Sequence, residues 1–141
     1  MLNFINDNEN IHRLQNKIAR LEEELKFYRQ QHKVKRGDIV IFKADNIIDR
    51  GIQSSARPHV VVSNDVGNYH SNICLVVPMT SQAKKLTLPT HFVSSYNNSV
   101  VLCEQIKTIR QDEILKTCGR LGEDEMKTIN NCLKVSLGIE G

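Results

Sequence analysis

The apolar residues near the start of the chain recur at alternating steps of three and four, a spacing that a helix places on one face. The seam consists of Ile11, Leu14, Ile18, Leu21, Leu25 and Tyr28. There is no glycine or proline from Asn10 to about His32, so the stretch is predicted to form a coiled-coil helix. A helix this short is marginally stable alone. We therefore expect it to self-associate, to pack against its own domain, or to dock on another protein.

After Lys33 the pattern changes to short strand-like runs separated by Gly, Pro, Asn and Ser. Strands are predicted at 39–42, 60–63, 73–77, 91–93 and 100–102, the last leading on to residue 106, with a long polar loop at 44–56. Helical spacing returns in the last twenty residues, where one face holds Met126, Ile129, Cys132, Leu133, Ser136 and Leu137. Gly138 suits the end of that helix, and a short helical turn is expected near 112–115. The sequence thus predicts an N-terminal helix over 1–33 and an α+β domain over 34–141, built on a small antiparallel barrel.

The composition narrows the class of protein. At 141 residues and 40% hydrophobic residues, the chain suits one core with an attached element, and no apolar run is long enough to span a membrane. The start at Met1 lacks the basic and apolar segments of a secretory signal, so we expect a cytoplasmic protein. Its cysteines lack metal-ligand spacing and are expected to be reduced and mostly buried, at Cys74, Cys103, Cys118 and Cys132.

Arg57 stands immediately before Pro58 and the apolar run Val60, Val61 and Val62. Proline fixes its own backbone and pushes the preceding residue toward an extended conformation. An arginine mounted on such a rigid strand entrance can clamp a phosphate, because its guanidinium is permanently charged and offers several donors in a plane. On local sequence alone, an ordinary solvated arginine at a strand edge is the favoured interpretation.

Other polar residues offer weaker candidates. Thr80 and Ser81 follow a buried strand, where hydroxyls either contact phosphate oxygens or cap a turn. His59 and His91 could form a general acid and base pair, although structural roles are favoured for both. The sequence holds no metal-binding, serine-hydrolase or nucleotide-phosphate motif, so no metal and no cofactor are expected.

Five ordered segments together resemble the MazF/PemK family of toxin endoribonucleases. They are Arg36-Gly37-Asp38-Ile39-Val40, Arg57-Pro58 through Asp65, Pro78-Met79-Thr80-Ser81-Gln82, Leu88-Pro89-Thr90-His91 and Ser99 through Ile109. The resemblance covers about Val34 to Gly141 and leaves out the N-terminal helix. It implies an SH3-like barrel, a homodimer, a cognate antitoxin, and metal-independent cleavage of single-stranded RNA such as mRNA. The N-terminal helix is expected to add a second dimer contact.

By this resemblance Arg57 and Thr80 are the catalytic residues, and the general base is unassigned. The products are expected to carry a 2′,3′-cyclic phosphate and a 5′-hydroxyl. RNA contacts are expected from two polar segments, at Gln53, Ser54, Ser55, Ser81, Gln82, Lys84 and Lys85.

One departure from the family pattern is Ile52, which stands where a glutamate is usual, while Gln53 fits the family's glutamine. Because of this altered loop, an alternative interpretation stays open, in which the protein is a non-catalytic relative of the family that binds RNA or protein without cutting RNA. A second alternative is a protein that poisons DNA gyrase by contact, which the arginine and threonine segments make less favoured. The N-terminal helix is also open to the interpretation that it covers the RNA groove.

Overall fold

The computed structural model describes residues 4–43, 57–81 and 88–141. The chain divides into two compact units, Met1–Lys33 and Val34–Gly141. The first contains α1 (Phe4–Gln31), which covers the predicted coiled-coil stretch and begins earlier than expected. The absence of Gly and Pro and the run of good helix formers account for its length.

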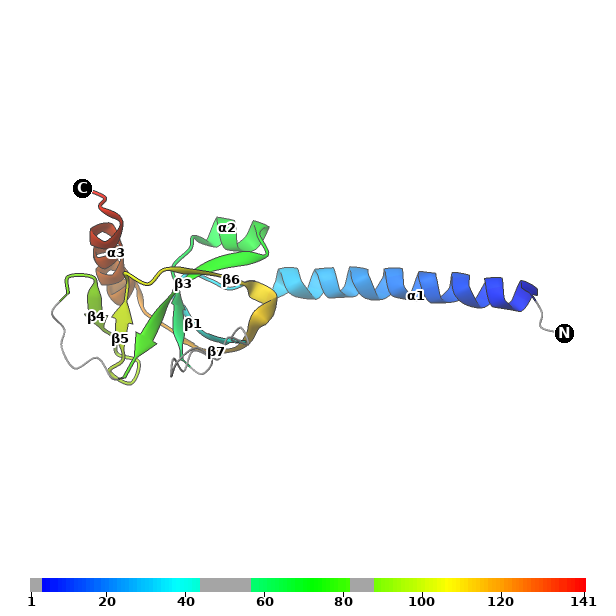
Figure 1. The fold of residues 1–141 in the computed structure, drawn as a ribbon, viewed down its shortest axis with the longest axis horizontal. Helices are drawn as coiled ribbons and strands as arrows, with labels where there is room; N and C mark the ends of the chain where they lie inside the picture. Colours follow the sequence, from blue (N-terminus) through cyan, green and yellow to red (C-terminus); the bar gives the residue numbers. More distant parts are fainter. Residues whose placement is uncertain (1–3, 44–56, 82–87) are drawn as a thin grey trace, which may run out of the picture. The chain divides into compact units, whose positions relative to one another are not determined.

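The second unit is built on an antiparallel sheet of seven described strands (Figure 1). These are β1 (Asp38–Phe42), β2 (His59–Val61), β3 (Ile73–Thr80), β4 (His91–Val93), β5 (Val100–Leu102), β6 (Lys107–Arg110) and β7 (Ile114–Arg120). The order is β4-β5-β3-β2-β1-β7, and β6 also pairs with β3. β3 is the longest strand, and it pairs with three others: β6 along its first half, β5 at its end, and β2.

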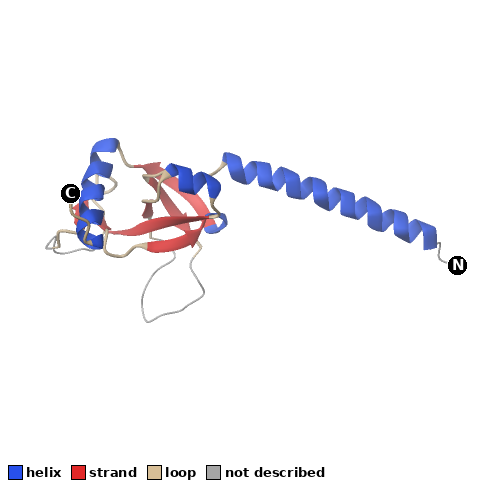
Figure 2. Ribbon diagram, turned by 90° about the horizontal axis from the view of Figure 1, so that it is seen from above, coloured by secondary structure: helices blue, strands red, loops and turns tan. Residues whose placement is uncertain are grey.

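One face of the sheet packs against α3 (Glu123–Leu137), which lies beside the layer of strands in Figure 2. The shared core contains Val60, Val77, Met79 and Val101 from the strands, and Met126, Ile129 and Cys132 from the helix. Acidic residues in the first turn suit the positive end of the helix dipole. Gly138 ends the helix in the left-handed conformation, at φ 69°, as the sequence predicts. Leu137 is exposed and does not join the core face.

The other face of the sheet carries a second core of Val34, Val40, Val61, Cys74, Val76 and Ile109. These residues alternate along β1, β2 and β3 with those under α3, as the two-residue period of a strand requires. Each strand therefore sends alternate side chains to two different surroundings. The end of this second face carries the candidate site.

Three elements were absent from the predictions. The segment after β2 forms a short helix, α2 (Asp65–His70), in which the Asn64 side chain accepts a hydrogen bond from the Gly67 N–H. β6 and β7 add two further strands, and the turn expected near 112–115 is a 3-10 helix, η1 (Gln111–Glu113), that leads directly into β7.

The described strands form a barrel-like sheet rather than a closed barrel, since β4 and β7 stand at its two ends.

Candidate active site

The site begins where the chain enters β2, at Arg57 and Pro58. The Pro58 carbonyl accepts a hydrogen bond of 2.9 Å from the Met79 N–H. The Arg57 carbonyl accepts one of 3.0 Å from Nδ1 of His59. Pro58 fixes its own φ angle, so both peptide units that flank it are held. The half-buried Arg57 side chain therefore starts from an anchored backbone.

Thr80 lies opposite Arg57 across the β2–β3 ladder. The paired residues His59↔Pro78, Val60↔Val77 and Val61↔Val76 set the register, and extending it past the Pro58–Met79 hydrogen bond brings Arg57 opposite Thr80. Pro58 and Met79 occupy a hydrogen-bonded position, so the next pair is a non-hydrogen-bonded one. The Cα atoms of such a pair are about 4.5 Å apart and their side chains share a face. The ladder thus brings together the two residues predicted to be catalytic.

His59 follows Arg57 by two residues along the chain and lies on the same face of β2, opposite Pro78. Its side chain packs edge-on against Phe42, with ring centroids 4.6 Å apart, and the residue is 1% exposed. Burial lowers the pKa of His59 to about 4, the hydrogen bond to the Arg57 carbonyl opposes this, and the charges of Lys107 and Arg57 add to it. The imidazole is therefore neutral at neutral pH. With Nδ1–H donating to the Arg57 carbonyl, Nε2 is unprotonated, and it has no hydrogen-bond partner in the described part of the chain.

Lys107 brings a second positive charge to this face. It lies at the start of β6 opposite Val76, and Val76 also pairs with Val61 on β2. Paired residues point to the same side of a sheet, so Lys107 shares the face that carries Arg57 and Thr80. Its side chain is exposed, and its charge reaches far enough to affect His59. Lys107 therefore adds a second positive charge to this face, within electrostatic reach of His59.

A separate network fixes the entrance to β4. The Glu104 carboxylate accepts hydrogen bonds from the Thr90 hydroxyl, at 2.8 Å, and from Nε2 of His91, at 2.9 Å. Burial favours the neutral form of Glu104, but the bonds from His91 and Thr90 outweigh it, so its pKa is lowered. Glu104 therefore remains ionised and ties β4 to the turn after β5.

The hydrogen bond from His91 to Glu104 also bears on whether His59 and His91 form a general acid and base pair. His59 and His91 lie three strand positions apart in the order β4-β5-β3-β2, about 14 Å along the sheet. Each has its own structural hydrogen bond, to the Arg57 carbonyl and to Glu104. They do not form an acid and base pair, in agreement with the structural roles that the sequence favoured.

Of the predicted RNA contacts, only Ser81 lies in the described residues, where it is exposed directly after Thr80. The others lie outside the described residues, at Gln53, Ser54, Ser55, Gln82, Lys84 and Lys85. Lys107 was not among the predicted site residues, because its place on this face depends on the long-range pairing of β6 with β3. The buried role of His59 was indicated only by its alternation with valines.

No cluster of three or more His, Cys, Asp or Glu side chains within ranges 4–43, 57–81 and 88–141 could hold a metal ion. In the same ranges, no helix combines the length and apolar character needed to cross a membrane. All four cysteines are free, and three are buried, at Cys74, Cys103 and Cys132.

Comparison with known proteins identifies the family. Residues 35–137 match the PemK-like, MazF-like toxins of type II toxin-antitoxin systems. The chain belongs to this family. The match includes the opposed pair Arg57 and Thr80 and excludes α1.

Individual relatives agree with the assignment. The chain is 33% identical to endoribonuclease MazF of Staphylococcus saprophyticus over 113 residues, which cover 75% of this chain and 92% of that protein. It is 32% identical to endoribonuclease EndoA of Bacillus subtilis over 112 residues, 75% of this chain and 96% of that one. A mycobacterial endoribonuclease solved with its cognate antitoxin has the same fold, with a TM-score of 0.63 and 24% identity over 77% of this chain and 98% of that chain.

Proposed function

We propose that this protein is the toxin of a type II toxin-antitoxin system and cuts single-stranded RNA without a metal ion. The observation that carries the proposal is the register that sets Arg57 opposite Thr80 on one face of the β2–β3 ladder. Its family membership and the two endoribonucleases that it resembles support the reaction class. Because mRNA is the proposed substrate, we also propose that the protein acts in the cytoplasm.

In the proposed reaction, a ribose 2′-hydroxyl attacks the adjacent phosphorus. A bond forms between O2′ and phosphorus, and the bond from phosphorus to O5′ breaks. The 2′-hydroxyl loses its proton and the departing O5′ gains one, so the products are a 2′,3′-cyclic phosphate and a 5′-hydroxyl. Negative charge builds on the phosphoryl oxygens in the transition state.

Arg57 and Thr80 have the chemistry to stabilise that charge. The guanidinium offers charged donors in a planar fork, and the hydroxyl can donate one more hydrogen bond. Removing one such donor from an active site costs on the order of a hundredfold to a thousandfold in rate. Lys107 adds positive charge where the RNA backbone would approach. The general base is not assigned, and His59 is a poor candidate because it is buried and held by the Arg57 carbonyl.

Other parts of the proposal rest on the family. We propose a homodimer and a cognate antitoxin as partners, in line with the mycobacterial relative solved with its antitoxin. The RNA contacts proposed outside the described residues are Gln53, Ser54, Ser55, Gln82, Lys84 and Lys85, with Ser81 beside Thr80.

The test is to incubate the purified, antitoxin-free protein with a long RNA in EDTA and to sequence the new 5′-hydroxyl ends. Arg57→Ala is run beside Arg110→Ala, which removes an exposed arginine from β6. We expect cuts at one short motif, lost with Arg57→Ala and kept with Arg110→Ala. RNA that stays intact with the folded wild-type protein would instead support the non-catalytic alternative.

A further inference from the structure

The seam of α1 is a row of large apolar side chains that remain open to solvent. Its six residues are Ile11, Leu14, Ile18, Leu21, Leu25 and Tyr28, and their exposed fractions range from 46% to 58%. A single exposed leucine is ordinary on a protein surface, but a continuous apolar row on one helix face indicates a partner. The family match begins at residue 35 and so gives no role to this helix.

We propose that α1 pairs with α1 of a second copy of this chain in a parallel, in-register coiled coil. In the heptad the a positions hold Ile11, Ile18 and Leu25, and the d positions hold Leu14, Leu21 and Tyr28. β-branched residues at a with leucine at d favour two parallel strands, because each position then packs against its own copy. The first two heptads of the seam follow this rule.

The charges beside the seam fit the same partner. In a parallel pair, a g residue faces the e residue of the next heptad on the other helix. Lys17 occupies g and Glu22 occupies e, so each copy of Lys17 faces Glu22 of its partner, and the pair forms twice by symmetry. Asn10 at g faces Gln15 at e, which is neutral. Among the side chains of residues 7–28, no facing pair brings like charges together.

An antiparallel pair is the principal competing arrangement. It would bring Leu14 against Leu25 of the partner and Lys17 against Glu24, so the charges alone permit both directions. The branched residues at a favour the parallel pair. Its layers keep a with a and d with d, the arrangement in which Ile at a and Leu at d suit two strands, whereas an antiparallel seam mixes a with d positions. The two directions also differ in geometry. Antiparallel pairing separates the Lys33 ends by about 40 Å, the length of the helix, while parallel pairing brings them together.

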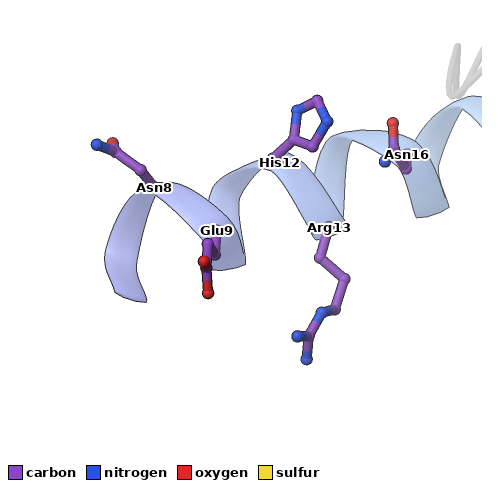
Figure 3. Close-up of a pocket in the computed structure, with 5 residues that line it drawn as sticks. All are labelled: Asn8, Glu9, His12, Arg13 and Asn16. Carbon is purple, nitrogen blue, oxygen red and sulfur yellow. The ribbon is translucent and has the colours of Figure 1, made fainter. Parts of the chain in front are cut away.

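The polar side of α1 supplies no competing site. Asn8, Glu9, His12, Arg13 and Asn16 line a shallow surface there, and all lie outside the a and d positions. Figure 3 shows that their side chains project from the helix in different directions and do not converge. This side is therefore the natural place for control substitutions.

A coil this short gains stability from its attachment to the domains. Helices gain most of their stability from packing of an apolar face rather than from intrinsic propensity. When both domains begin at the same end of the coil, contact between the domains raises the effective concentration of the helices for each other. Pairing of the helices likewise raises the effective concentration of the domains. The parallel direction is the one that permits this mutual support within a single dimer.

The test is disulfide trapping in the full-length protein, with Leu14→Cys at the seam and Asn16→Cys on the polar side. Equivalent d positions of a parallel coil lie close enough for a disulfide, whereas residues on the outer faces do not. After mild oxidation we expect the Leu14→Cys monomer band to be lost on a non-reducing gel. Asn16→Cys should stay at the level of the wild type, which measures any background from the native cysteines.

Two outcomes would overturn the proposal. One is equal crosslinking of Leu14→Cys and Asn16→Cys, or none by either. The other is a crosslink that needs a mixture of Leu14→Cys with Leu25→Cys, which is the signature of the antiparallel pair. Leu21→Cys provides a second d position, and circular dichroism of each reduced variant shows that α1 is still formed.

Discussion

His59 should make the stability of the fold depend on pH. The side chain is 1% exposed, and burial is the largest cause that lowers the pKa of this imidazole from 6.5 to about 4. Unfolding exposes the ring, which then takes up a proton that the folded protein excludes. The stabilisation is complete above pH 6.5 and is lost as the pH falls toward 4. A difference of this size corresponds to about 3 kcal/mol of unfolding free energy.

The assay is urea unfolding at a series of pH values from 7 to 4, on the wild type and on His59→Asn. The asparagine amide lies at the position of Nδ1, so it can still donate to the Arg57 carbonyl but does not titrate. Between pH 6.5 and 4 the free energy of unfolding of the wild type should fall more steeply than that of the variant, by up to about 1.4 kcal/mol per pH unit. The variant-minus-wild-type difference removes the contribution of all other groups.

His70→Asn is the matched control, because it removes an exposed histidine from α2. It shows whether a change in slope comes from the buried ring rather than from the loss of any histidine. Equal slopes for the wild type and His59→Asn would contradict this prediction, since the buried imidazole would then exchange its proton as freely as one in water.

Three further predictions concern packing, the Glu104 network and the end of α3. Ile129→Ala removes a side chain that is 0% exposed between α3 and the sheet, and it should cost about 2–5 kcal/mol in chemical denaturation, against little for the exposed Val135→Ala. Glu104→Gln keeps the size of the side chain but weakens the hydrogen bonds from Thr90 and His91. It should lower stability by about 1–2 kcal/mol at pH 7, and by progressively less as the pH falls and the wild-type carboxylate becomes protonated. A loss that stays constant with pH would contradict the role given to the ionised carboxylate. Gly138→Ala forces a side chain into the left-handed conformation at φ 69°, and a cost near 1 kcal/mol is expected in thermal unfolding, whereas no change would show that the end of α3 frays freely.

The sequence predicted the elements whose local pattern is strong. β4 and β5 have the predicted bounds, and α3 and its glycine cap follow from helical spacing and from the conformational freedom of Gly138. Arg57 and Thr80 were identified through the family resemblance, since local sequence alone left each with an ordinary structural interpretation. The ladder between β2 and β3 then supplied the physical reason why they belong together.

The elements that the sequence missed depend on long-range pairing. β7 shows no regular alternation of buried and exposed residues, and its register with β1 shifts twice, so its strand character comes from β1. α2 is six residues long, too short for a visible period, although Asn64 before Asp65 was a usable capping signal. Lys107 lies on the face that carries Arg57 and Thr80 only because β6 pairs with β3, a contact that local sequence does not encode.

We propose that Arg57 and Thr80 act on one phosphate as a unit. The most direct measurement is a double-mutant cycle with Arg57→Ala, Thr80→Val and the double variant, comparing single-turnover cleavage of an RNA that contains the mapped motif. If the two donors serve the same transition state, each single change should cost about a hundredfold to a thousandfold, and the double variant little more. Losses that multiply in the double variant, or a Thr80→Val protein with wild-type activity, would contradict the account.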